Sequence, residues 1–204
     1  MVFPAGNLAM MPEQPTDRSA LTGVPIHPDI AARWSPRAFD PEAVIDDTDL
    51  LALLEAARWA ATWGARQPVR FVVGRRGERP FDDLAAQLRR GNAYAKAASA
   101  LILVCADDGE DANTAQYARV DAGAAMANLA IEAVSRGLQV HPMAGFDVDG
   151  ARQTFDLADG LAPLAIVAVG RLGDYSQVPE EIVERDSRPR SRRPLSEVVL
   201  NWPL

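Results

Sequence analysis

Cysteine and histidine are scarce in this 204-residue sequence, which holds one cysteine and two histidines. Cys105 alone cannot form an internal disulfide. With only His27 and His141, the chain offers few ligands for a zinc site and few candidates for the histidine of a serine hydrolase triad. Residues 1–11 contain no basic residue, and Pro4 interrupts their apolar stretch, so no secretory signal is expected. The sequence therefore predicts a cytoplasmic protein without a metal centre.

Positive charge and long apolar runs are lacking as well. The chain carries 21 Lys+Arg against 28 Asp+Glu, which gives a formal net charge of -7. Because a net basic face is needed to hold a phosphate backbone, nucleic acid is not expected as a partner. No segment approaches the ~18 apolar residues of a spanning helix, so a membrane is not expected as a partner either.

Glycine-rich nucleotide-binding motifs are also missing, although the chain has 14 glycines. No G-x-G-x-x-G or G-x-x-x-x-G-K pattern stands between an expected strand and an expected helix. The sequence therefore predicts neither a Rossmann dinucleotide site nor a P-loop. A phosphate group on a ligand would have to be held by side chains.

The spacing of apolar residues and helix caps predicts helices and strands around one core. The run Ala100–Ala106 is apolar throughout, which favours a central strand covered on both faces. Gly137 stands where the residue after a long helix is expected. The expected helices are 29–34, 47–59, 82–90, 116–136 and 148–157, and the expected strands are 69–73, 100–106, 138–143 and 164–169.

The two ends of the chain differ from the predicted domain, residues 26–184. Residues 1–25 are rich in proline and glycine and are expected to form an irregular N-terminal arm. Residues 185–204 are expected to form a C-terminal arm that begins with five arginines: Arg185, Arg188, Arg190, Arg192 and Arg193. A disordered basic tail is one interpretation. Docking is favoured by the apolar residues that follow, which are Leu195, Val198, Val199, Leu200 and Trp202.

A second group of arginines flanks a serine at the end of the first expected helix, in the segment Arg33-Trp34-Ser35-Pro36-Arg37. Guanidinium groups bind phosphate oxygens through paired hydrogen bonds, and a serine hydroxyl adds a further donor. The group suits a small phosphorylated ligand. A solvated surface pair is the alternative interpretation of an isolated motif of this kind.

Two further segments lie where a predicted element ends. Residues 141–146, His-Pro-Met-Ala-Gly-Phe, follow a strand, and Gly145 lets backbone N–H groups approach a planar ligand closely. His141 itself is interpreted as a packed or hydrogen-bonded residue rather than a catalyst. Residues 60–71 lead from a helix into a strand through Thr62, Trp63 and Gln67.

Together these segments resemble the motifs of the FMN-dependent nitroreductase family. That family typically opens with Arg-x-Ser-x-Arg/Lys-x-Phe, which is matched here by residues 33–39. The later matches come in the family's order and are Gln67, Pro68 and Phe71, then Gly137, Leu138, Pro142, Gly145 and Phe146, then Arg190, Arg192, Pro194, Leu195, Glu197 and Val198. The resemblance runs from about residue 28 to the C-terminus.

The resemblance implies an α+β fold, a three-layer α-β-α domain with a mixed, mostly antiparallel central sheet. It also implies a homodimer that binds FMN between its subunits, with the C-terminal arm of each chain exchanged and completing the partner subunit. NAD(P)H would be the reductant, and a nitroaromatic, a quinone or a similar small molecule would be the acceptor.

By position, the resemblance assigns cofactor contacts and no catalytic side chain. The arginines and Ser35 would surround the phosphate, the ribityl chain and the pyrimidine edge, and Arg37 would support negative charge on the reduced ring. Asn92 would pair with the pyrimidine edge, and residues 62–65 would come from the other subunit. The full set of expected cofactor-binding residues is Arg33, Trp34, Ser35, Arg37, Thr62, Trp63, Gln67, Asn92, Pro142, Met143, Ala144, Gly145, Arg190 and Arg192.

The sequence departs from the family in the segment expected to meet the partner's flavin. The usual Ser-Ser-x-Asn is replaced by Thr62-Trp63-Gly64-Ala65, which loses an amide and gains an indole. Two alternatives to a flavin oxidoreductase therefore stay open. One is a non-catalytic flavin-binding or storage protein of the same fold, and the other is a relative that uses a deazaflavin or a specialised acceptor.

Overall fold

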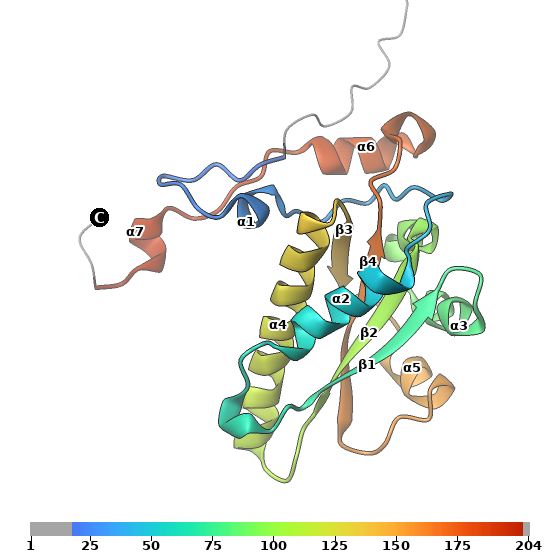
Figure 1. Ribbon diagram of the computed structural model, residues 1–204, viewed down its shortest axis with the longest axis vertical. Helices are drawn as coiled ribbons and strands as arrows, with labels where there is room; N and C mark the ends of the chain where they lie inside the picture. Colours follow the sequence, from blue (N-terminus) through green and yellow to red (C-terminus); the bar gives the residue numbers. More distant parts are fainter. Residues whose placement is uncertain (1–17, 202–204) are drawn as a thin grey trace, which may run out of the picture.

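A four-stranded sheet forms the middle of the computed structural model, which describes residues 18–201. Residues 1–17, most of the expected N-terminal arm, and residues 202–204, with Trp202, lie outside the described part. The strand order is β1-β2-β4-β3 (Figure 1), and the strands are β1 Val69–Arg75, β2 Ala100–Asp107, β3 Gln139–Met143 and β4 Leu161–Gly170. Every pairing between them is antiparallel. The four predicted strands are confirmed.

Helices cover both faces of this sheet (Figure 1). One face carries α2 (Asp47–Arg58) and α4 (Ala112–Ser135), and the other carries α3 (Arg79–Gln87) and α5 (Val148–Thr154). Alternate side chains of β2 enter the two cores, Ile102 with α2 and α4, and Leu103 with α3. Because both of its faces are buried, β2 has no polar side, as its apolar run predicts. The expected three-layer α+β architecture is confirmed.

The longest helix, α4, begins and ends where its caps allow. Asp111 accepts hydrogen bonds from the backbone N–H groups of Asn113 and Thr114, so the helix starts at Ala112 rather than at residue 116. At the other end, Gly137 has a φ of 69° and takes the left-handed position after the helix, as expected. With 24 residues, α4 is about 36 Å long at a rise of ~1.5 Å per residue.

The helix expected over residues 82–90 is displaced. It starts earlier, at Arg79, because a proline in the first turn needs no N–H partner there. It also ends earlier, at Gln87, since Leu88 leaves the helix in an extended conformation and pairs with Phe146. A 3-10 helix, η2 (Arg90–Ala97), follows, so Gly91 does not end the helix as predicted.

The first and last segments of the described residues, 18–33 and 188–201, lie on the same side of the domain (Figure 1). The helices here are α1 (Pro28–Ala32), η3 (Tyr175–Gln177), α6 (Glu180–Ser187) and α7 (Leu195–Val198). A small core of Trp34, Ala38, Tyr175 and Val183 packs α6 against the segment after α1. Helix α6 belongs to the body of the domain up to Ser187, and the chain after it runs beside residues 18–33.

A membrane crossing finds no support in residues 18–201, since none of their helices combines the length and the apolar character that it needs.

Candidate functional site

Two arginine-containing segments that are far apart in the sequence, residues 33–37 and 188–193, meet beside α1. Arg33 follows the last turn of α1, and its Nη1 donates to the Ser35 hydroxyl at 3.4 Å. Arg190 of the same chain donates to the carbonyl oxygens of Arg33 at 2.8 Å and of Ala31 at 3.1 Å. Arg192 lies close enough to Arg33 to lower its pKa. The expected meeting of these residues thus occurs within one chain.

The charge of this group is not compensated by the described protein. Burial lowers the pKa of Arg33, and the charge of Arg192 lowers it further. Burial also lowers the pKa of Arg190, as do the charges of Arg33, Arg192 and Arg18. Across residues 18–201, none of these four arginines forms a salt bridge. A bound anion would relieve the repulsion between these guanidinium groups.

Arg37 is held differently from Arg33. Its Nη1 donates to the buried carboxylate of Asp186 at 2.7 Å, and its backbone N–H donates to the same carboxylate at 2.6 Å. The hydroxyl of Tyr175 donates to Asp186 at 2.7 Å. Arg37 Nε is buried and has no hydrogen-bond partner among the described residues, as is also true of Arg18 Nε and Gln139 Oε1. The side chain of Trp34, also expected at the cofactor, is buried in the small core with Tyr175.

A second element of the expected site is the contact between η2 and the loop after β3. Asn92 Nδ2 donates to the carbonyl of Gly145 at 2.9 Å. A Cβ atom on Gly145 would lie 2.7 Å from Asn92 Nδ2, so glycine permits this approach. Pro142 and Ala144 are exposed, whereas Met143 is buried in the core and presents only its backbone.

His141 and Tyr94 connect these segments. His141 Nδ1 lies 2.8 Å from the carbonyl oxygen of Pro36, which can only accept, so Nδ1 carries the hydrogen. Nε2 then accepts from the Tyr94 hydroxyl at 3.0 Å. Burial lowers the pKa of His141 and raises the pKa of Tyr94 to about 12. The interpretation of His141 as a hydrogen-bonded residue is confirmed.

Thr62, Trp63 and Gln67 lie elsewhere. The 3-10 helix η1 (Trp63–Ala65) packs against the N-terminal half of α4, where Trp63 stacks on Tyr117 with ring centroids 4.9 Å apart. Asp121 of α4 accepts from the Trp63 backbone N–H at 3.0 Å. Thr62 and Gln67 line a cavity of about 460 Å³ that opens between α2, β1 and α4.

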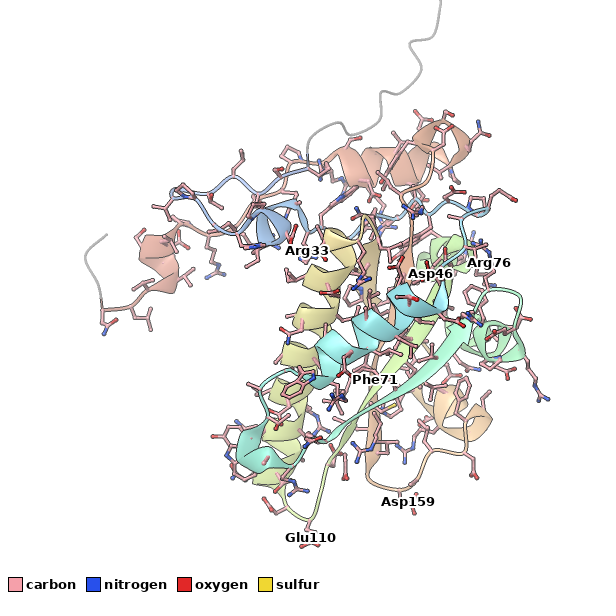
Figure 2. All side chains as sticks on the ribbon, viewed as in Figure 1. Arg33, Asp46, Phe71, Arg76, Glu110 and Asp159 are labelled. Carbon is pink, nitrogen blue, oxygen red and sulfur yellow. The ribbon has the colours of Figure 1, made fainter. Side chains whose placement is uncertain are left out.

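The two groups of expected residues are therefore separated in one chain. Figure 2 labels Arg33 beside α1 and Phe71, a wall of the cavity, farther down the molecule. Trp63 lies farther still, on Tyr117 in the N-terminal half of α4. The segment 64–67 also has unusual backbone geometry, with φ of 58° at Ala65 and 51° at Gln67. Asn tolerates this left-handed conformation better than Ala does, so the departure from the family at Ala65 carries strain.

Several residues of these sites give no signal in the sequence. Asp186 belongs to an acidic helix in which Glu181 and Glu184 pair only with Arg185 and Arg188 on the surface. No local feature of the sequence distinguishes the buried carboxylate of Asp186 from those of Glu181 and Glu184.

Among residues 18–201 there is no group of three or more His, Cys, Asp and Glu that could hold a metal ion.

The sequence belongs to the nitroreductase family, whose sequence model matches residues 30–98 and 75–171. A solved structure described as an oxidoreductase containing FMN is similar over nearly the whole chain. It has a TM-score of 0.82 and 33% identity, and the alignment covers 91% of this chain and 96% of that one.

Two curated relatives are similar in sequence. One is an uncharacterized 15.4 kDa protein of Mycolicibacterium smegmatis, 59% identical over 64% of this chain and 94% of the relative. The other is a Streptomyces coelicolor protein named provisionally as an NADH dehydrogenase/NAD(P)H nitroreductase. It is 28% identical over 69% of this chain and 82% of the relative.

Proposed function

We propose that this protein is a flavin oxidoreductase that uses FMN to carry hydride from NAD(P)H to a nitroaromatic, a quinone or a similar small acceptor. Membership of the family, the FMN-containing structural neighbour and the name of the Streptomyces relative support the proposal. The observation that carries it is the uncompensated group formed by Arg33, Arg190 and Arg192.

The residues beside α1 fit the phosphate of FMN. A phosphate monoester is a dianion with three acceptor oxygens, and guanidinium groups and a hydroxyl are its preferred donors. Arg33, Ser35 and Arg192 would hold that group, while Arg190 is occupied with backbone carbonyls and keeps the segment in place. Because no carboxylate in residues 18–201 pairs with these arginines, no ion pair has to break first.

The contact of Asn92 with Gly145 fits the polar edge of the flavin ring. With Nδ2 held by the Gly145 carbonyl, the amide is fixed in orientation, and the exposed backbone of Pro142 and Ala144 borders the same loop. His141 and Tyr94 fix this loop to Pro36, so three segments share one rigid network. Rigid donors in a half-buried site stabilise charge without reorganisation.

Arg37 would act less strongly than a free cation. The Asp186 carboxylate compensates its charge through Nη1, and Nε is buried without a partner. We therefore assign Arg37 to the positioning of the loop and, through Nε, to a single hydrogen bond. Bound FMN supplies the hydride chemistry, and the protein supplies binding, orientation and a polar surrounding.

A homodimer accounts for the separation of the expected residues. Thr62 and Trp63 lie at the opposite end of α4 from Arg33, and α4 is about 36 Å long. One small ligand cannot contact both groups of one chain, but it can contact one group from each of two chains. Exposed apolar side chains on α2, α4 and α7, and just after α2 and α7, favour such an association. Among them are Leu51, Trp59, Val120, Leu195, Val198 and Leu200.

The direct test is to release the cofactor from purified protein by heat and to identify it by chromatography. We expect FMN, together with oxidation of NADH or NADPH when menadione or a nitroaromatic is added. FMN without turnover would favour the storage alternative, and a deazaflavin would favour the specialised relative. Arg192→Ala should lower FMN occupancy, whereas Arg79→Ala, at a 91% exposed side chain, should not.

A further inference from the structure

The segment before α1 lies outside the residues matched to the family and yet touches the arginine group. Ala20 N–H donates to the carbonyl of Ala31 at 2.9 Å, which ties the segment to α1. Arg18 Nη2 donates to the carbonyl of Arg188 at 2.8 Å, and the carbonyl of Arg18 accepts from Arg190. Figure 1 shows this part of the chain running beside the segment between α6 and α7.

The side chain of Arg18 is packed rather than free. Its guanidinium carbon lies 5.0 Å from the centroid of the Trp34 ring, and Trp34 is itself buried. A planar guanidinium stacks well on an indole while its edge donates hydrogen bonds. Stacking on Trp34 and bonding to the Arg188 carbonyl fix Arg18 to two segments that are distant in the sequence.

This arrangement has an electrostatic consequence. Arg18 brings a further positive charge to a place where Arg192 already lowers the pKa of Arg33, and where Arg33 and Arg192 lower the pKa of Arg190. Like charges gathered without carboxylates repel one another, and a bound anion relieves that repulsion. The hydrogen bonds of Arg18 hold the C-terminal segment in place against the repulsion.

We propose that residues 18–20 form a strap that fastens the C-terminal segment to α1. Arg18 acts in it as a positioning residue that, together with Arg190, sets Arg192 opposite Arg33 for a phosphate monoester. The strap rests on the proposed function only in naming that ligand as FMN. Residues 18–20, which lie outside the match to the family, thus contribute to binding of the phosphate and do not contribute to binding of the flavin ring.

The test compares two ligands that differ only in the phosphate. Cofactor-free protein is titrated with FMN and with riboflavin, and flavin fluorescence gives the dissociation constants. Arg18→Ala should weaken FMN at least tenfold, which corresponds to about 1.4 kcal/mol, and riboflavin less than twofold. Arg18→Lys keeps a long stem and a donor and should restore part of the FMN affinity. Arg79→Ala, the exposed control, should change neither.

A second variant breaks the strap without removing a guanidinium group. Ala20→Pro deletes the N–H that binds Ala31 and should also weaken FMN more than riboflavin. Equal weakening of both flavins by Arg18→Ala, or no weakening of either, would overturn the strap, because a merely structural role affects both ligands alike.

A third measurement separates the strap from the proposed function. Inorganic phosphate should raise the melting temperature of the cofactor-free wild type more than that of Arg18→Ala. If the wild type binds neither flavin, the proposed function is wrong, and this phosphate-dependent difference alone then decides on the strap. Equal shifts in both proteins would refute it.

Discussion

The arginines near the start of the domain differ in whether a carboxylate compensates their positive charge. Arg37 has such a partner, whereas the group of Arg33 and Arg192 does not. Arg37 pairs with the buried Asp186, which is also bound by Tyr175. Arg33 precedes Arg37 by four positions, and Arg192 follows Asp186 by six positions. These two arginines lie close to other arginines and have no salt bridge within residues 18–201. A paired arginine holds the fold together, whereas an unpaired group is prepared for an anion. A ligand site is therefore indicated less by the number of arginines than by the positions of the carboxylates that could pair with them.

Removing the carboxylate of the compensated pair should have the largest effect on stability. Asp186→Ala leaves the guanidinium of Arg37, which is 23% exposed, without its partner. We expect the free energy of unfolding to fall by about 3 kcal/mol, as measured by urea denaturation. Glu181→Ala, which breaks an exposed pair with Arg185, should cost less than about 0.5 kcal/mol. Equal losses in the two variants would contradict the comparison.

A smaller loss is expected when the pair keeps its charges but loses a supporting hydrogen bond. Tyr175→Phe removes the hydroxyl that donates to Asp186 and should lower the free energy of unfolding by about 1.5 kcal/mol. Tyr117→Phe removes the hydroxyl of a tyrosine whose ring stacks on Trp63 at the surface. That control should leave urea denaturation nearly unchanged, and a loss like that of Tyr175→Phe would count against the buried network.

The sequence predicts some of these features and not others. The apolar run of β2 and the glycine after α4 are local patterns, and the structure bears out the elements they predict. The Arg37–Asp186 pair joins residues 149 positions apart, and Asp186 resembles its acidic neighbours in every local respect. Such a pairing follows from the packing of α6 on Trp34, which periodicity alone does not reveal.

Arg76 is a further residue whose role follows from its position in the fold and cannot be predicted from the sequence. In the sequence it is an ordinary arginine at the end of β1, yet its Nη atoms donate to the carbonyls of Ala43 at 2.6 Å and Ala97 at 2.7 Å. It holds loops of the body together and is a poor neutral control for ligand binding. Arg79, on the exposed surface of α3, is the better one.

The same substitution made in both arginine groups should give opposite results at low salt. Arg37→Gln should destabilise the cofactor-free protein strongly, since Asp186 stays buried without a cation. Arg192→Gln should leave it equally stable or more stable by up to about 0.5 kcal/mol, because repulsion with Arg33 disappears. That gain should vanish near ~1 M salt, where charges are screened within ~3 Å. Thermal unfolding at two salt concentrations measures both, with Arg79→Gln as the exposed control.

His141 should give the smallest effect, and its sign follows from burial. Burial lowers the pKa of His141 in the folded protein, and Arg37 and Arg185 lower it further, while the Pro36 carbonyl and Asp186 oppose the shift. Below the ordinary pKa of about 6.5, the unfolded chain therefore binds more protons than the folded one. The contribution of His141 to stability is complete above that pH and is lost as the pH falls towards the folded pKa. His141→Gln should flatten this part of the stability profile measured by urea denaturation between about pH 7 and 5. An unchanged slope would mean that other groups set it. A slope that steepened would mean that the Pro36 carbonyl and Asp186, which raise the pKa of His141, outweigh its burial.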